Sequence, residues 1–209
     1  MKRYLTLLYV LLLVILSACN GKSSQKEENK RLIMVTMEPQ RYFTEAIAGD
    51  KFLVESMVPK GSSPETYDPT PQQLTRLSKS EAYLRIGHIG FEQSWMDRLT
   101  DNAPHMQIFD TSKGVELIHG EGHNHGDHFH AGGVDPHIWN SISNARIIAK
   151  NTFQALITLD KTNENYYLHR YESLCKVINR TDSVINNIFQ TRKADHAFMI
   201  YHPALSYFA

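Results

Sequence analysis

The chain has 209 residues, and its 22 lysine and arginine residues balance its 22 aspartate and glutamate residues. A chain without net positive charge lacks the electrostatic basis for binding nucleic acid, which excludes that class of partner. Eleven histidines are present, and five of them are concentrated in one short segment.

The N-terminus has the pattern of a secretory signal. Lys2 and Arg3 precede an apolar run over residues 4–16, and small residues follow at Ser17 and Ala18. A basic start, a short apolar stretch and small residues before the cleavage site are typical of such signals. Leu-Ser-Ala-Cys19 also resembles the lipobox of bacterial lipoproteins. That resemblance implies that residues 1–18 are removed and that Cys19 carries lipid, the alternative being an ordinary signal in which Cys19 is incidental.

Residues 19–30 predict a flexible tether between the lipid and the fold. The stretch from Asn20 to Lys30 is polar, is rich in Ser and Lys, and has almost nothing to bury. Because residues 1–18 contain Lys2 and Arg3 and no acidic residue, their removal leaves a formal charge of −2.

From Arg31 onward, short apolar runs alternate with helical patterns. Strands are expected at Leu32–Met37, Phe52–Val58, Ala82–Ile86 and Met106–Phe109. Helices are expected from Pro39, with Tyr42, Phe43, Ala46 and Ile47 on one face, and at Gln72–Ser78 and Phe91–Leu99. Strands that alternate with helices predict parallel βαβ units in an α/β domain.

The second half of the chain is predominantly helical. Ser143 is the expected cap of a helix that runs to Leu159. A longer helix is predicted over Asn163–Phe189, with a stripe at Tyr167, Tyr171, Leu174, Ile178, Thr181, Ile185 and Ile188. At 1.5 Å per residue it spans about 40 Å, enough to connect two lobes, and a two-helix coiled coil is the alternative. Ala197–Tyr201 is predicted to be a strand.

The segment from His119 to His130 points most directly to metal. It contains His119, His123, His125, His128 and His130 within twelve residues. Neutral imidazole is a good ligand for borderline metals such as zinc. A polar loop that is His-rich by accident is the alternative.

Three other loops carry candidate ligands. Glu65 lies in the Pro-rich loop Gly61–Pro71, which otherwise has the pattern of an ordinary surface turn. His137 lies between Pro136 and Ile138, where its ring is expected to be half-buried, and a satisfied core histidine is the alternative there. His202 follows the predicted strand that ends at Tyr201. Since ligands of open α/β sheets bind beyond the carboxyl ends of strands, the three loops can converge on one crevice.

Five motifs together resemble the solute-binding lipoproteins of bacterial zinc and manganese ABC importers. They are Ile47-Ala48-Gly49-Asp50, Val58 through Pro71, Gly87 through Glu92, Asp135 through Trp139, and Tyr201 through Ala209. The resemblance implies two α/β lobes joined by a long helix, with the metal between them. It divides this chain into an N-terminal lobe over 31–160 with a His-rich loop at 119–132, a connecting helix over 161–190, and the start of a C-terminal lobe over 191–209.

The same resemblance implies a set of metal ligands. His137 matches the family's second metal histidine, and His202 matches the third ligand, where manganese-type members tend to place Glu. Glu65 stands where the first ligand is usually His, so it binds directly, acts through water or has no part. The family's fourth ligand, a late carboxylate, has no counterpart before Ala209. We therefore expect most of the second lobe to be absent, as in a truncated or partial sequence.

The expected function is the capture of Zn²⁺ and its delivery to an ABC permease, by a monomer anchored outside the cytoplasm through Cys19. The loop from His119 to His130 is expected to be a weaker auxiliary site. A manganese-specific binding protein and a metal-binding adhesin are alternatives from the same resemblance. A secreted zinc hydrolase is disfavoured, because the chain contains neither His-Glu-x-x-His nor Gly-x-Ser-x-Gly. No chemical step is expected.

Overall fold

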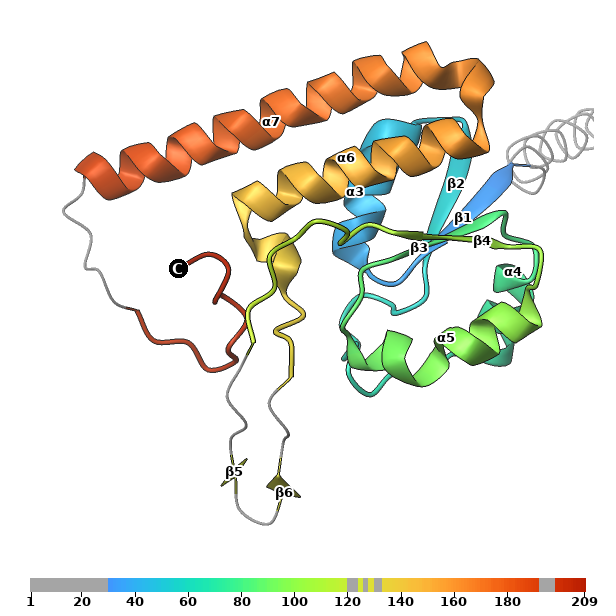
Figure 1. The fold of residues 1–209 in the computed structure, drawn as a ribbon, viewed down its shortest axis with the longest axis horizontal. Coiled ribbons are helices and arrows are strands. Elements are labelled where there is room, and N and C mark those ends of the chain that lie inside the picture. Colours follow the sequence, from blue (N-terminus) through green and yellow to red (C-terminus); the bar gives the residue numbers. More distant parts are fainter. Residues whose placement is uncertain (1–29, 120–123, 126–127, 130–132, 192–197) are drawn as a thin grey trace, which may run out of the picture. The chain divides into compact units, whose positions relative to one another are not determined.

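A four-stranded sheet forms the centre of the fold. The structure, a computed structural model, describes residues 30–119, 124–125, 128–129, 133–191 and 198–209. The strands are β1 (Arg31–Val35), β2 (Phe52–Ser56), β3 (Ala82–Arg85) and β4 (Gln107–Asp110), in the order β2-β1-β3-β4. β1 pairs in parallel with β3, and β3 pairs in parallel with β4 (Figure 1).

Helices connect the strands and continue beyond them. They are α3 (Glu38–Ala48), α4 (Pro71–Leu77), α5 (Gly90–Asn102), α6 (Ile142–Leu159) and α7 (Glu164–Thr191), with 3₁₀ turns η1 (Ile138–Asn140) and η2 (Lys161–Asn163). The predicted α/β fold is confirmed, with element boundaries that differ by a few residues. No helix in the described part of the chain is long and apolar enough to cross a membrane.

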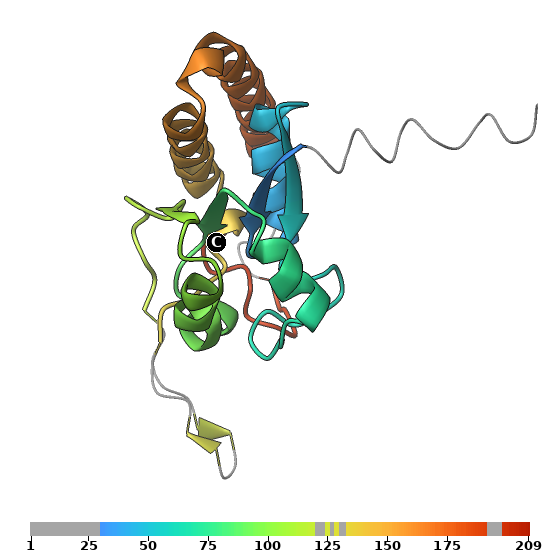
Figure 2. The ribbon, with the colours of Figure 1, turned by 90° about the vertical axis from the view of Figure 1, so that its right-hand side faces the viewer.

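The two central strands, β1 and β3, are buried on both faces of the sheet, which explains why they are almost continuously apolar. Side chains alternate along β1: Ile33 and Val35 pack into one core, and Leu32 and Met34 pack into the other. The first core contains residues of α3, α6 and α7, and the second contains residues of α4 and α5. Figures 1 and 2 show these two groups of helices on opposite sides of the sheet.

Two helices begin at recognisable caps. At α4 the Thr70 hydroxyl accepts a hydrogen bond from the Gln73 main chain, and the Gln73 side chain accepts one from the Thr70 main chain. The sequence predicts Ser143 as the cap of α6, but the cap in the structure is Ser141. Ser141 has the extended backbone of a cap, and its hydroxyl accepts a hydrogen bond from the main-chain N of Asn144.

The long helix α7 is buried along its first half and exposed along its second. Tyr167, Leu174 and Ile178 lie in the core formed with α3 and α6. Farther along, Ile188 of the predicted stripe is exposed, as is Phe189. On α3, Tyr42 is also exposed, in contrast to its predicted place on the buried face.

After α7 the chain returns to the region before α6. Residues 198–201 form no strand in the part of the chain that the structure describes, so the strand predicted at Ala197–Tyr201 is wrong there. A strand needs a neighbour for its main-chain hydrogen bonds, and an apolar run alone does not provide one. Residue 197 itself lies outside the described residues.

Candidate metal site

His137 is held by the residue two positions before it. The carboxylate oxygen Oδ1 of Asp135 accepts hydrogen bonds from the main-chain N of His137 at 2.9 Å and from its ring Nδ1 at 2.8 Å. The first bond is a local turn of the kind that Asp favours. The side chain of His137 is 16% exposed, which confirms the predicted half-buried ring. Its Nε2 is thereby left as the ring atom available to a ligand.

His202 meets His137 at that atom. The Nε2 atoms of the two rings are 3.1 Å apart, although 65 positions separate the residues in the chain. The ring centroids are 5.0 Å apart, at an interplanar angle of 78°. In the neutral tautomer of His137 whose Nδ1 donates to Asp135, the lone pair lies at Nε2, where it can accept a hydrogen bond from His202 or bind a metal ion.

The separation of these two nitrogens is close to that required by one metal ion. Two Zn–N bonds of about 2.0–2.1 Å at the tetrahedral angle place the nitrogens about 3.3–3.4 Å apart. The observed 3.1 Å between His137 and His202 differs from this by a few tenths of an ångström. An ion can therefore replace the proton between the rings with only a slight movement of either side chain.

The carboxylate of Asp135 is suited to orient a metal-binding histidine. Burial alone would raise the pKa of Asp135, but hydrogen bonds from Ser206 and from the amide and ring of His137 outweigh this effect and hold the pKa below its usual value. Asp135 therefore remains ionised at neutral pH. An ionised partner at Nδ1 fixes the tautomer and increases the basicity of Nε2.

The C-terminal segment is fastened to the structure around His137. The side-chain amide of Asn140 donates to the main-chain oxygen of Ala204 at 2.7 Å. The hydroxyl of Tyr207 accepts from the main-chain N of Ile118 and donates to the main-chain oxygen of Asp135, each at 2.9 Å. Ala204 and Tyr207 follow His202 closely in the chain, so these hydrogen bonds help to hold His202 beside His137.

Glu65 does not join the histidine pair. Its Oε2 accepts a hydrogen bond from the main-chain N of Gly90, at the start of α5, at 3.1 Å. In the described part of the chain, no three His, Cys, Asp or Glu side chains lie close enough together to hold a metal ion. The structure thus gathers two of the three expected ligands, and the part that Glu65 plays stays a prediction.

The His-rich loop is described only in part. Asn124–His125 and His128–Phe129 form two short antiparallel strands, β5 and β6, with His125 opposite His128 in the backbone register. A bridge joins His119 to Val134 at the base of this hairpin. His123 and His130 lie outside the described residues, and so does Cys19. The metal-binding role of this loop stays a prediction.

Two residues of the site have no role in the sequence-based prediction. Asp135 stands in the Asp-Pro-His motif, where an Asp two positions before His is a local signal for the observed turn. Tyr207 has no comparable signal, because its partners Ile118 and Asp135 are distant in the chain.

The α/β domain brings two histidines together, with a carboxylate behind one of them, which is the arrangement expected of a metal site. The chain belongs to the ZnuA family, described as zinc-uptake complex component A, periplasmic, which it matches over residues 33–209. The family resemblance noted in the sequence is thereby confirmed.

Named relatives agree with this assignment. The chain is 34% identical over 197 residues to the manganese ABC transporter substrate-binding lipoprotein PsaA of Streptococcus pneumoniae. It is 33% identical over 196 residues to the metal ABC transporter substrate-binding lipoprotein FimA of Streptococcus parasanguinis. Each match covers 89% of this chain, and the chain spans 62% of the length of either relative. Both are named as substrate-binding proteins and not as enzymes.

Solved structures give the same fold. A zinc-bound deletion mutant of ZnuA superposes with a TM-score of 0.77 at 32% identity, over 86% of this chain and 66% of that one. A manganese-bound periplasmic metal-binding protein from Candidatus Liberibacter asiaticus superposes with a TM-score of 0.73 at 22% identity, over 86% and 64% respectively. The second match concerns the fold alone.

Proposed function

We propose that this protein captures Zn²⁺ outside the cytoplasm and delivers it to the membrane permease of an ABC importer. The observation that carries the proposal is the 3.1 Å separation of the Nε2 atoms of His137 and His202. The orientation of His137 by Asp135 supports it, because metal-binding histidines commonly donate their second ring nitrogen to a carboxylate. Binding and release suffice for this role, and no chemical step is required.

Titration of the protein with Zn²⁺ in competition with a chromophoric chelator tests the proposal. His137→Ala and His202→Ala should each weaken the tight site by more than about 100-fold, beyond the loss typical of changes behind the ligands. His105→Ala is the matched control, because His105 is an exposed histidine outside the site. Equal affinity in all four proteins would overturn the proposal.

Manganese is the second candidate cargo, and two observations favour it. The relative PsaA is named as a manganese transporter protein, and Glu65, at the family's first ligand position, would supply the oxygen donor that Mn²⁺ prefers. Because zinc binds most sites more tightly than manganese, the two metals must be titrated separately and in competition. Retention of Mn²⁺ against an excess of Zn²⁺ would assign manganese as the cargo.

The His-rich hairpin is proposed to be an auxiliary collecting site. The sequence of this loop contains His119, His123, His125, His128 and His130, and its first residue forms the His119–Val134 bridge. Deletion of residues 119–132 should lower the total zinc stoichiometry and spare the tight site. Calorimetry that finds unchanged stoichiometry would contradict this role.

Membrane anchoring through Cys19 is proposed from the Leu-Ser-Ala-Cys19 sequence, in agreement with relatives that are named lipoproteins. Metabolic labelling with a radioactive fatty acid should label the protein, and Cys19→Ser should abolish the label. Labelling that survives the substitution would exclude Cys19 as the anchor. We propose that the anchored protein acts as a monomer.

A further inference from the structure

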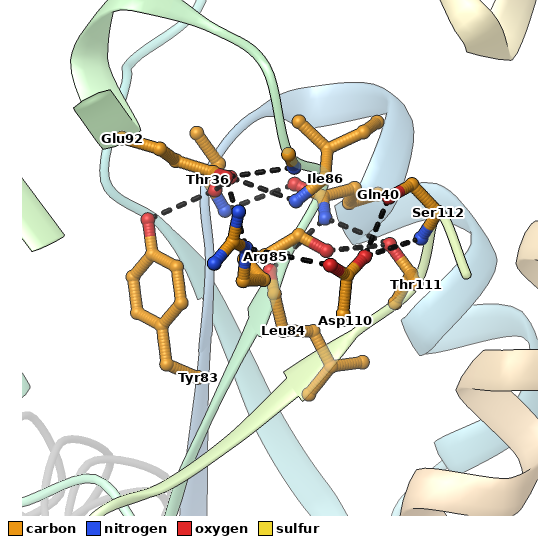
Figure 3. Close-up of polar contacts among 11 residues, drawn as sticks. Thr36, Gln40, Tyr83, Leu84, Arg85, Ile86, Glu92, Asp110, Thr111 and Ser112 are labelled. Carbon is orange, nitrogen blue, oxygen red and sulfur yellow. Dashed lines mark hydrogen bonds and ion pairs between the residues drawn. The ribbon is translucent and has the colours of Figure 1, made fainter. Parts of the chain in front are cut away.

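Glu92 is a buried carboxylate that binds the turn after β3. It lies in the first turn of α5 and is 3% exposed. The main-chain N of Ile86 donates to its Oε1 and that of Gly87 to its Oε2, both at 2.7 Å, and the Thr36 hydroxyl also donates to Oε1 (Figure 3). The guanidinium Nε of Arg85 lies 3.6 Å from Oε2. Glu92 therefore connects the carboxyl ends of β1 and β3.

The turn that Glu92 binds has an unfavourable backbone. Gly87 and His88 have φ values of 76° and 58°, both in the left-handed region. Glycine adopts this region readily, but a residue with a side chain does so at a cost and needs support from its surroundings. The two main-chain hydrogen bonds to Glu92, from the consecutive N–H groups of Ile86 and Gly87, provide such support.

The same turn holds the segment that carries Glu65. The main-chain N of Gly90 donates to Oε2 of Glu65 at 3.1 Å, and that of Phe91 donates to the main-chain oxygen of Pro64 at 2.8 Å. The approach is close: a Cβ at Gly90 would lie 2.5 Å from Oε2 of Glu65. The conformation of residues 86–90 consequently determines where Pro64 and Glu65 lie.

We propose that Glu92 is a positioning residue for metal capture, which fixes the turn Ile86–Gly90 and, through it, the Pro64–Glu65 segment. This inference rests on the proposed function, in which Glu65 stands at a ligand position. Glu92 itself contacts no metal in this role. It accepts hydrogen bonds from the main chain of the turn. The end of the turn and the start of α5 in turn donate hydrogen bonds to the Glu65 side chain and to the main-chain oxygen of Pro64.

The energetics of Glu92 favour a local role over a contribution to global stability. Burial raises the pKa of Glu92, against the lowering effects of the Thr36 hydroxyl, the two amides and Arg85. The charged form is thus less favourable in the folded protein than in the unfolded chain. A neutral side chain of the same shape would avoid this penalty but would not accept both amides.

Hydrogen exchange tests the first step of the proposal. In Glu92→Gln the new NH₂ group faces one of the two amides, so peptides covering residues 86–92 and 62–68 should exchange faster than in the wild type. Leu99→Ala is the matched control, because Leu99 is fully buried in the apolar core on the same helix, seven residues after Glu92. It should lower the melting temperature without selectively exposing those peptides. Unchanged exchange in Glu92→Gln would overturn the inference.

Zinc affinity tests the second step. Glu92→Gln should weaken zinc binding about 10-fold, in the range typical of changes behind metal ligands, whereas Leu99→Ala should not. If Glu92 acts through Glu65, the double variant Glu92→Gln/Glu65→Ala should bind zinc as Glu65→Ala does. Two outcomes would overturn this inference alone. One is that the losses of zinc affinity from Glu92→Gln and Glu65→Ala add in the double variant. The other is that Glu92→Gln binds zinc like the wild type while His137→Ala abolishes binding. Binding insensitive to His137→Ala would overturn the proposed function and this inference together.

Discussion

The carboxylate of Asp135 forms two hydrogen bonds with His137, one with the main-chain N at 2.9 Å and one with the ring Nδ1 at 2.8 Å. The first contact fixes the backbone turn, and the second fixes the ring. Together they leave the histidine few orientations, so that Nε2 faces His202 before any metal arrives. A preorganised ligand of this kind binds with a smaller loss of side-chain entropy.

Removal of the Asp135 carboxylate should weaken metal binding without unfolding the protein. Asp135→Asn keeps an acceptor oxygen but loses the charge, whereas Asp135→Ala loses both contacts. We expect losses in zinc affinity of about 10-fold and about 100-fold respectively, measured by chelator competition at pH 7.5. Asp101→Asn, an exposed aspartate on α5, is the control. If Asp135→Asn and Asp135→Ala lose the same zinc affinity, a neutral acceptor oxygen at residue 135 contributes nothing to metal binding.

Loss of the Tyr207 hydroxyl should loosen the C-terminal segment. Tyr207→Phe leaves the Ile118 amide without its acceptor and the Asp135 main-chain oxygen without this donor. The free energy of unfolding should fall by about 1–2 kcal/mol in chemical denaturation, and the Ile118 amide should exchange faster. Tyr42→Phe is the control, since Tyr42 is 56% exposed. A Tyr207→Phe protein with unchanged stability and exchange would contradict the anchoring role.

The order of strands and helices can be predicted from the sequence because the signals are local. The apolar runs over β1 and β3 are continuous, as expected for strands buried on both faces, and Pro and Thr mark the start of α4. Ser141 and Ser143 are both acceptable caps by residue type, and the choice depends on backbone geometry that the sequence does not specify. The predicted cap of α6 is therefore two residues late.

The contacts of the candidate site depend on distant parts of the chain and are harder to predict. Motifs single out His137 and His202, but the contact between them joins residues 65 positions apart. The β-propensity of the run before His202 predicts a strand, and such propensity is reliable only where a partner strand exists. The role of Tyr207 could not be predicted either, because it depends on contacts with Ile118 and Asp135, which are distant in the chain.

Stability should depend on pH through Glu92, in the direction set by its raised pKa. The folded protein holds this proton more tightly than the unfolded chain does, so the contribution of Glu92 to stability is fully present below the unfolded pKa of about 4.5. It is lost as the pH rises through the folded pKa. The free energy of unfolding of the wild type relative to Glu92→Gln should therefore fall as the pH rises from about 4. Urea denaturation of both proteins across this range measures the difference, and a difference that grows with pH would refute the assignment.

Gly49 should be required for α7 to pack at the end of α3. It has φ 59°, and a Cβ there would lie 2.1 Å from the Tyr166 hydroxyl, which donates to Asp50 at 2.9 Å. Gly49→Ala therefore combines backbone strain with a clash and should destabilise the protein by about 2–3 kcal/mol in denaturant. Gly61→Ala is the matched control, because Gly61 has φ 88° but no atom within 4 Å of the position that a Cβ would take. Only the backbone strain of about 1 kcal/mol then applies.

The contribution of the clash can be isolated by shortening its partner. Tyr166→Phe removes the hydroxyl, so Gly49→Ala should be less harmful in that background than in the wild type. The backbone strain and the approach of Arg170 Nε, 2.9 Å from the position of the Cβ, remain in both backgrounds. The four proteins of this cycle can be compared by urea denaturation at one pH. If Gly49→Ala costs the same in both backgrounds, the Tyr166 hydroxyl does not restrict residue 49, and the cost arises from backbone strain and from the Arg170 side chain.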